Sequence, residues 1–219
     1  MIKAVILDLD DTLCLTEAAC FDMENETLAA MGREPMTRAT HRANWGKPLF
    51  EAIFDRSPGI DLEEFKRYYE PTIKHYTEEG LLDVIPEENY KALDRLLALG
   101  KSLVVLTSRT HTELKHMLDG GHELASRIET FYYRDNMQYH KPDSRAFAHI
   151  EVEHGRKPEE CVYIGDSVTD AIAANGAGLQ LIISLESGLR TREDFADQSV
   201  ERFINVFPEV VDAVQSLDK

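Results

Sequence analysis

Apolar residues change their spacing along the chain, and the spacing predicts the elements. Residues 3–9 form a short aliphatic and β-branched run that ends in carboxylates, which predicts a buried strand. Over residues 15–85 the apolar positions recur at helical spacing without a strand pattern. Pro58-Gly59 breaks this region, and Asp61 is a candidate N-cap for its last helix. We therefore expect a helical insertion after the first strand.

From residue 86 onward, helical and strand patterns alternate. The expected strands cover residues 102–106, 130–133, 161–164, 180–183 and 203–206. The expected helices cover residues 90–97, 114–118, 144–154, 168–175 and 210–217. Such alternation predicts a parallel sheet with helices on both faces. The expected fold class is α/β: a Rossmann-like core of residues 1–14 and 86–219, with a small α-helical domain inserted at residues 15–85.

Composition and charge limit the classes of partner that the chain is expected to bind. The 24 Lys and Arg residues against 40 Asp and Glu residues give a net charge of −16, which argues against nucleic acid and membrane surfaces as partners. An apolar fraction of 43% with 29% charged residues is typical of a globular chain. Three cysteines at no metal-ligand spacing and a short N-terminal apolar run indicate neither a disulfide framework nor a signal peptide. We expect a cytoplasmic protein, either a monomer or a homodimer.

Two acidic motifs follow predicted strands. In DLDDTL, Asp8 and Asp10 are two residues apart, so their carboxylates point to the same side if strand geometry persists. Two such acids repel each other unless a cation or unlike protonation states separate their roles. Mg²⁺ prefers such hard oxygen ligands. In YIGDSVTD, Asp166 and Asp170 share a face if a helix begins there. The alternatives are a solvated turn for the first motif and a simple helix N-cap at Asp166 for the second.

Two further motifs carry groups that suit phosphate. VVLTSR ends a predicted strand in Thr107 and Ser108, whose hydroxyl and N–H groups can donate to an anionic oxygen. HKPDS places Lys141 before Pro142, which favours an extended backbone at Lys141. Each motif alone also fits an ordinary strand end or a solvated lysine. Because parallel strands present their carboxyl ends at one edge of a sheet, all four motifs are expected to converge there.

The order of the four motifs resembles the haloacid dehalogenase-like superfamily, and the resemblance spans nearly the whole chain. It implies that residues 15–85 are a cap domain and that Asp8 is a nucleophile forming an aspartyl-phosphate. It also implies that Asp10 protonates the leaving group and then activates water. Leu15 departs from this pattern, because many capped members have aspartate there, and this weakens any inference about substrate by analogy.

The same resemblance implies roles for the remaining motif residues. Thr107 would hold a phosphoryl oxygen with help from Ser108, and Lys141 would neutralise charge and orient the nucleophile. Asp170 would support the metal or Lys141. The residues implied to hold Mg²⁺ are Asp8, Asp10 (through its backbone carbonyl) and Asp166.

The second acid decides between branches of the superfamily. Its dehalogenases and phosphonatases lack an acid at the position of Asp10, so the resemblance favours phosphoryl transfer. We expect a Mg²⁺-dependent phosphatase that acts on a small phosphorylated metabolite, a phosphomonoester. A β-phosphoglucomutase-like sugar phosphomutase is the nearest alternative, although such mutases carry Ser-Arg shortly after a cap glycine, where this chain has Lys47-Pro48. A receiver-like domain or a non-catalytic binding protein is a further alternative.

A basic segment interrupts the acidic chain. It contains Arg33, Arg38, His41, Arg42 and Lys47, with the single acid Glu34. One interpretation is a solvated helix face. The other is that Arg42 or Lys47 binds an anionic or sugar-like leaving group from the cap.

Overall fold

The computed structural model describes residues 1–45 and 49–218, and the chain divides into two compact units. The core unit consists of Met1–Cys14 and Ile85–Lys219, and the helical unit consists of Leu15–Val84. The two ends of the helical unit meet, because the N–H of Leu15 donates to the carbonyl of Val84 at 3.2 Å.

Six parallel strands form the sheet of the core unit, in the order β3-β2-β1-β4-β5-β6. The strands are β1 (Ala4–Leu7), β2 (Ser102–Leu106), β3 (Thr130–Tyr132), β4 (Cys161–Gly165), β5 (Gln180–Ser184) and β6 (Arg202–Ile204). Leu7 lies level with Val105 of β2 and Ile164 of β4. The chain leaves β1 toward one side of the sheet and later crosses to the other, so β1 lies at the switch point where ligands of such sheets bind.

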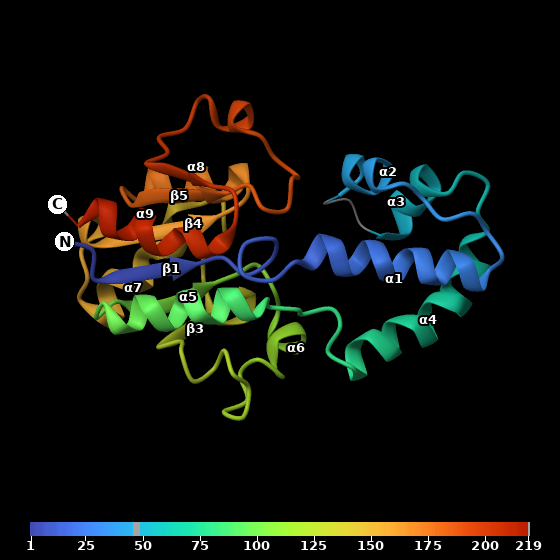
Figure 1. The fold of residues 1–219 in the computed structure, drawn as a ribbon, viewed down its shortest axis with the longest axis horizontal. Helices are drawn as coiled ribbons and strands as arrows, with labels where there is room; N and C mark the ends of the chain where they lie inside the picture. Colours follow the sequence, from blue (N-terminus) through green and yellow to red (C-terminus); the bar gives the residue numbers. More distant parts are fainter. Residues whose placement is uncertain (46–48, 219) are drawn as a thin grey trace. The chain divides into compact units, whose positions relative to one another are not determined.

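Helices cover both faces of this sheet (Figure 1), which confirms the α/β prediction. On one face, α5 (Glu87–Ala98) and α9 (Val210–Leu217) pack against alternate residues of the strands. On the other, α7 (Ala148–His154) and α8 (Val168–Gly176) pack against the remaining ones. The central strands β1 and β4 are buried along their whole length, which explains their continuous apolar sequences.

Two expected helices of the core unit differ in the structure. The helix expected at residues 114–118 is a single turn, α6 (His111–Leu114), followed by turns that include Gly120 and Gly121. Paired glycines disfavour a helix because their backbone entropy cost is high. The helix expected at residues 144–154 begins as a 3₁₀ turn, η2 (Ser144–Phe147), before α7.

The helical unit contains α1 (Thr16–Ala30), α2 (Arg38–Ala43), α3 (Leu49–Arg56) and α4 (Leu62–Glu78). The predicted cap of α4 is confirmed, since the Asp61 carboxylate accepts a hydrogen bond from the N–H of Glu64 at 2.8 Å. A small apolar cluster holds these helices together; its buried members are Leu28, Met36, Ile53, Ile60 and Phe65.

Beside this cluster lies a network of buried charges within the helical unit. The side chain of His41 is fully buried, with Nδ1 2.7 Å from Glu17 Oε1 and Nε2 3.4 Å from Glu24 Oε1. The Nη1 of Arg56 donates to both oxygens of Glu24, at 2.6 and 2.7 Å. Burial lowers the pKa of His41, but the hydrogen bonds to the two glutamates outweigh it and raise the pKa above its ordinary value. The two carboxylates therefore favour the cationic form of His41.

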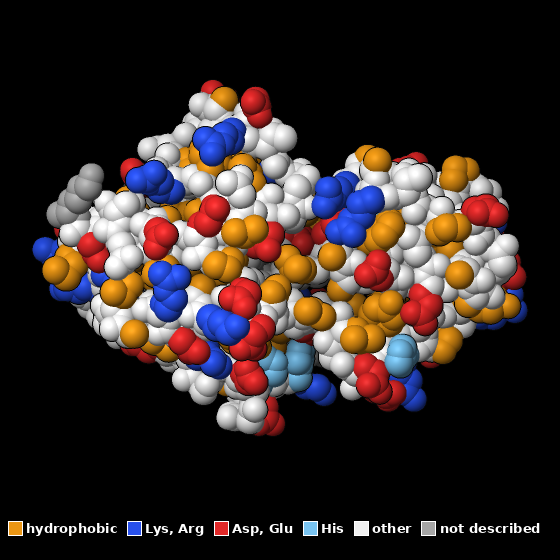
Figure 2. All heavy atoms as spheres, viewed as in Figure 1, with side chains coloured by type: hydrophobic (Ala, Val, Ile, Leu, Met, Phe, Trp, Pro, Cys, Tyr) orange, Lys and Arg blue, Asp and Glu red, His pale blue; other side chains and the backbone are white. Residues whose placement is uncertain are grey.

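Acidic side chains are dispersed over the face drawn in Figure 2 and are interspersed with lysine, arginine and hydrophobic groups. The surplus of acids is thus spread over the surface on this face. Among the described helices, none is both long enough and apolar enough to cross a lipid bilayer.

Candidate active site

The carboxyl ends of β1 and its two neighbours carry three of the residues singled out from the sequence. Asp8 follows β1, Thr107 follows β2 and Asp166 follows β4. The N–H of Asp8 donates to the carbonyl of Ile164 at 2.8 Å, so the backbone at Asp8 is still paired with β4. The rigid sheet thus fixes the start of each side chain.

Lys141 connects the acids at this edge. Its Nζ lies 2.7 Å from Asp8 Oδ1 and 2.6 Å from Asp170 Oδ1, and it donates to the Tyr163 hydroxyl at 3.0 Å. The side chain is only 6% exposed, so these contacts replace solvent around the ammonium. The carboxylates of Asp8 and Asp170 raise the pKa of Lys141 despite its burial, which keeps it charged.

Both oxygens of Asp170 are occupied. Oδ1 accepts from Lys141 and from the Tyr163 hydroxyl at 2.8 Å, and Oδ2 accepts from the hydroxyl of Ser167 at 2.6 Å. Burial raises the pKa of Asp170, but Lys141 and the hydroxyl donors outweigh it and hold the pKa below its ordinary value. Asp170 is therefore a fixed anion that holds Lys141 beside Asp8.

Three buried carboxylates at this edge form a group that can hold a cation. Asp8, Asp166 and Asp170 each offer one oxygen, and these oxygens lie within 4.8 Å of one another. Burial raises the pKa of Asp8 to about 7 and, together with its neighbouring carboxylates, raises the pKa of Asp166 well above the ordinary value. One lysine does not balance three such acids, so a hard divalent cation fits the donor set and its charge.

Asp10 is held by a residue to which the sequence assigned no role. The Nε of Arg109 lies 3.1 Å from each oxygen of Asp10, and its Nη2 lies 2.6 Å from Oδ1. Arg109 closes the VVLTSR motif, directly after Thr107 and Ser108. Its position next to these two residues was the feature of the sequence that could have indicated a place in the site. Tyr163 was missed in the same way, inside the YIGDSVTD motif.

The predicted hydroxyl residues and the predicted specificity residues of the helical unit lie in different environments. Thr107 is fully buried and its hydroxyl accepts from the N–H of Arg109 at 3.2 Å, whereas Ser108 is exposed. In the helical unit, the Nε of Arg42 lies 3.5 Å from an oxygen of Glu17. Lys47 lies outside the described residues. The roles of Arg42 and Lys47 in substrate choice stay predictions.

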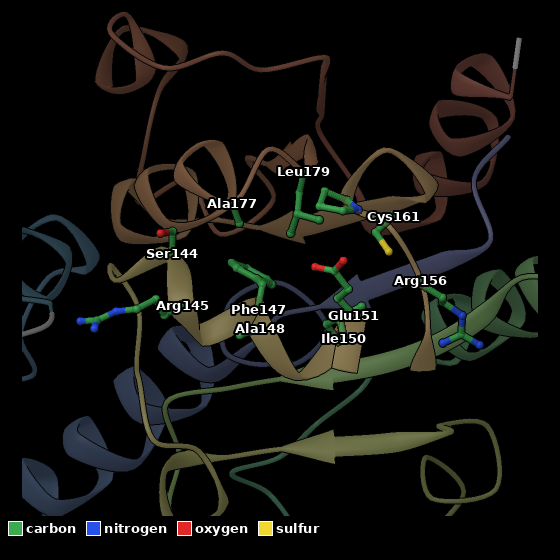
Figure 3. A pocket seen from close by; sticks show the side chains of 11 residues that line it. Ser144, Arg145, Phe147, Ala148, Ile150, Glu151, Arg156, Cys161, Ala177 and Leu179 are labelled. Carbon is green, nitrogen blue, oxygen red and sulfur yellow. The ribbon is translucent and has the colours of Figure 1, made fainter. Parts of the chain in front are cut away.

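An apolar cavity of about 180 Å³ lies away from this edge (Figure 3). It lies between α7, η2 and the strand β4, with Phe147, Ile150, Cys161 and Leu179 among its lining residues. Cys161 is the first residue of β4, whereas Asp166 follows the last, so the cavity opens near the opposite end of that strand. None of the residues predicted to act on phosphate lines it.

The chain is similar to known proteins over most of its length. The family described as haloacid dehalogenase-like hydrolase matches residues 5–184. A phosphoglycolate phosphatase of Xylella fastidiosa is 27% identical over 195 residues, covering 88% of this chain and 83% of the relative. A phosphoglycolate phosphatase of Agrobacterium fabrum is 29% identical over 185 residues, covering 81% and 78%. The crystal structure of CbbY from Rhodobacter sphaeroides in complex with phosphate has a TM-score of 0.65 at 23% identity, covering 96% of each chain, and shows the same fold.

Proposed function

Because the chain belongs to the haloacid dehalogenase-like hydrolase family, we propose that it is a Mg²⁺-dependent phosphatase that hydrolyses a small phosphomonoester through Asp8. The observation that carries the proposal is the position of Lys141 between Asp8 and Asp170, beside Asp166. This arrangement presents a nucleophilic oxygen, a cation for phosphate and a place for a metal at one edge of the sheet. The similarity to phosphoglycolate phosphatases supports the phosphomonoester substrate.

Two chemical steps follow from the proposed roles. An oxygen of Asp8 attacks phosphorus, the bond from phosphorus to the leaving oxygen breaks, and the Asp10 carboxyl gives that oxygen its proton. Water then attacks phosphorus, Asp10 takes the water's proton, and the bond between Asp8 and phosphorus breaks to release inorganic phosphate. Thr107 and Lys141 bind the transferring group in both steps.

The metal in this proposal would be held by Asp8, Asp166 and the backbone carbonyl of Asp10. When bound, Mg²⁺ supplies positive charge that reduces the repulsion between the carboxylate of Asp8 and the phosphate dianion. Asp170 remains with Lys141, because both of its oxygens already accept hydrogen bonds. The partner we propose is a small phosphorylated metabolite. A cytoplasmic location stays a prediction.

The experiment that tests this function is a phosphate-release screen of the full chain with Mg²⁺. The panel contains sugar phosphates, phosphoglycolate, nucleotides and phosphorylated cofactors, and at least one is expected to release phosphate. Asp8→Asn should abolish the release on every active substrate while leaving the thermal unfolding transition in place. Undiminished turnover in that variant would falsify the role of Asp8.

The product separates hydrolysis from the mutase alternative. A phosphatase releases inorganic phosphate from each molecule of substrate, whereas a mutase returns a product that keeps its phosphate at another position. ³¹P NMR of the reaction mixture distinguishes the two outcomes. The same assay with Arg42→Ala and Lys47→Ala, on the best substrate and on a generic aryl phosphate, tests whether these residues select the leaving group.

A further inference from the structure

The two acids of the DLDDTL motif are each paired with a different cation. Asp8 is paired with Lys141 at 2.7 Å, and Asp10 is paired with Arg109 through the three contacts given above. A lysine ammonium acts as a point charge, whereas a guanidinium binds in a planar fork that also fixes the orientation of the carboxylate plane. In the proposed reaction Asp10 must meet first the leaving oxygen and then the attacking water, and Asp10 is the acid that is paired with the arginine.

The arginine of this pair is sheltered from solvent, and the aspartate is partly exposed. The Arg109 side chain is 11% exposed and the Asp10 side chain is 36% exposed. Surface pairs with both partners in water contribute little, because water competes for each contact. The shelter of Arg109 means that its contacts to Asp10 are not readily exchanged for contacts to water.

The backbone at both partners is also anchored. The N–H of Arg109 donates to the Thr107 hydroxyl at 3.2 Å, and its carbonyl accepts from the N–H of Arg134 at 2.9 Å. Asp10 lies in a tight turn, in which the N–H groups of Leu13 and Cys14 both donate to the carbonyl of Leu9, at 3.0 and 2.9 Å. Since β1 and β2 are neighbours in the sheet, their rigid pairing sets the distance between the two loops.

We propose that Arg109 is a positioning residue that holds the Asp10 carboxylate in the orientation required to meet the leaving oxygen and then the attacking water. This inference rests on the proposed phosphatase function, because it acts through Asp10. A displacement of about 1 Å in a reacting group can cost on the order of 100-fold in rate, so loss of the fork should lower kcat. KM should change little, because Arg109 is committed to Asp10 and the phosphate is bound by other groups.

The test is made on the full chain with saturating Mg²⁺. Arg109→Ala and Arg109→Lys are made in the wild-type and Asp10→Asn backgrounds. On the best alkyl phosphate, Arg109→Ala should lower kcat by about 10- to 100-fold. The kcat of Arg109→Lys should lie between those of Arg109→Ala and the wild type. In the Asp10→Asn background we measure the single-turnover burst of p-nitrophenolate from p-nitrophenyl phosphate, whose leaving group needs no proton. Removal of Arg109 should not change that burst, because residues that act as a unit are not additive.

A matched control comes from a second arginine fork in the core unit. Arg127 donates to both oxygens of Asp94, at 2.6 and 3.0 Å, and its side chain is 20% exposed. Arg127→Ala removes a similar pair and should leave kcat and KM unchanged. Thermal unfolding of every variant shows whether a loss of rate only follows a loss of folded protein.

Three results would overturn the proposal. An unchanged kcat in Arg109→Ala shows that Asp10 needs no orienting partner. A raised KM of Arg109→Ala, together with a higher p-nitrophenyl phosphate concentration for the half-maximal burst when Arg109 is removed from Asp10→Asn, shows that Arg109 binds the substrate directly. A fall in kcat that matches the fraction of unfolded protein shows a purely structural role. If the wild-type enzyme hydrolyses no phosphomonoester, the proposed function itself fails, which is a different outcome from an active enzyme that is insensitive to Arg109.

Discussion

The ammonium of Lys141 lies 2.6 Å from the Oδ1 of Asp170, and neither side chain is more than 6% exposed. The same ammonium reaches Asp8, so a single positive charge is shared between two buried carboxylates. This sharing makes the lysine important both for stability and for the proposed chemistry.

Replacing Lys141 by methionine should therefore lower both the stability and the activity. Removing one partner of a buried ion pair leaves an uncompensated charge, which typically costs about 3–5 kcal/mol in the free energy of unfolding. We also expect kcat to fall by at least about 100-fold, the usual loss for one donor to a transferring group. Urea unfolding and phosphate release measure the two effects. A stable variant with full activity would show that Lys141 is dispensable.

Gly165 permits the close approach of Asp170 to the end of β4. A Cβ at position 165 would lie 2.7 Å from both Cγ and Oδ2 of Asp170. Because Asp170 is fixed by its hydrogen bonds, Gly165→Ala should displace it, lower stability by about 1–3 kcal/mol and reduce kcat. Gly120→Ala is the control, since a Cβ there meets nothing within 4 Å. Equal stability of both variants would contradict this account of the site.

The acidic group should bind Mg²⁺ in the absence of substrate. A ligand at 100 times its Kd stabilises a protein by about 2.7 kcal/mol, so added Mg²⁺ should raise the unfolding temperature of the wild-type chain. Asp166→Asn removes one carboxylate, and the rise should then be small or absent. Chelation with EDTA should abolish phosphate release, and added Mg²⁺ should restore it. If Asp166→Asn is stabilised as strongly as the wild type, the metal lies elsewhere.

The buried network of the helical unit should make its stability depend on pH. The pKa of His41 is raised in the folded chain, so its contribution to stability is complete below its unfolded pKa and is lost as the pH rises through the folded pKa. Burial raises the pKa of Glu17, but hydrogen bonds from His41 and Arg38 outweigh it and lower the pKa, so this contribution is lost as the pH falls. Glu24 and Arg56 complete the charges around the ring.

Urea unfolding of the wild type and of His41→Asn, measured at several pH values, checks this dependence. The wild type should lose stability above neutral pH relative to the variant, by about 1.4 kcal/mol for each unit by which the pKa is raised. Parallel stability curves for the two proteins would mean that His41 does not titrate between its glutamates.

Much of the fold follows from apolar spacing, because buried parallel strands have continuous apolar sequences. The strand expected at residues 102–106 is β2 itself, and the strand expected at residues 161–164 differs from β4 by one residue. The predicted extent of the helix at residues 114–118 was wrong, since three apolar positions within little more than one turn do not outweigh the paired glycines that follow.

The polar contacts were less predictable than the fold. The pairing of Arg109 with Asp10 depends on how two loops are placed by neighbouring strands, which spacing within either loop does not specify. Glu17 and Glu24 were assigned no role from the sequence, although their separation of seven residues puts them on one face of a helix. The packing of α2 and α3 in the helical unit buries that face and supplies the cations that pair with the two glutamates.

The hydrogen bond between Leu15 and Val84 has an evolutionary consequence. An insertion whose two ends lie side by side can be lengthened, shortened or exchanged for another domain while the register of β1 with its neighbours is unchanged. Changes within Leu15–Val84 would then leave the acids and the lysine at the sheet edge in place.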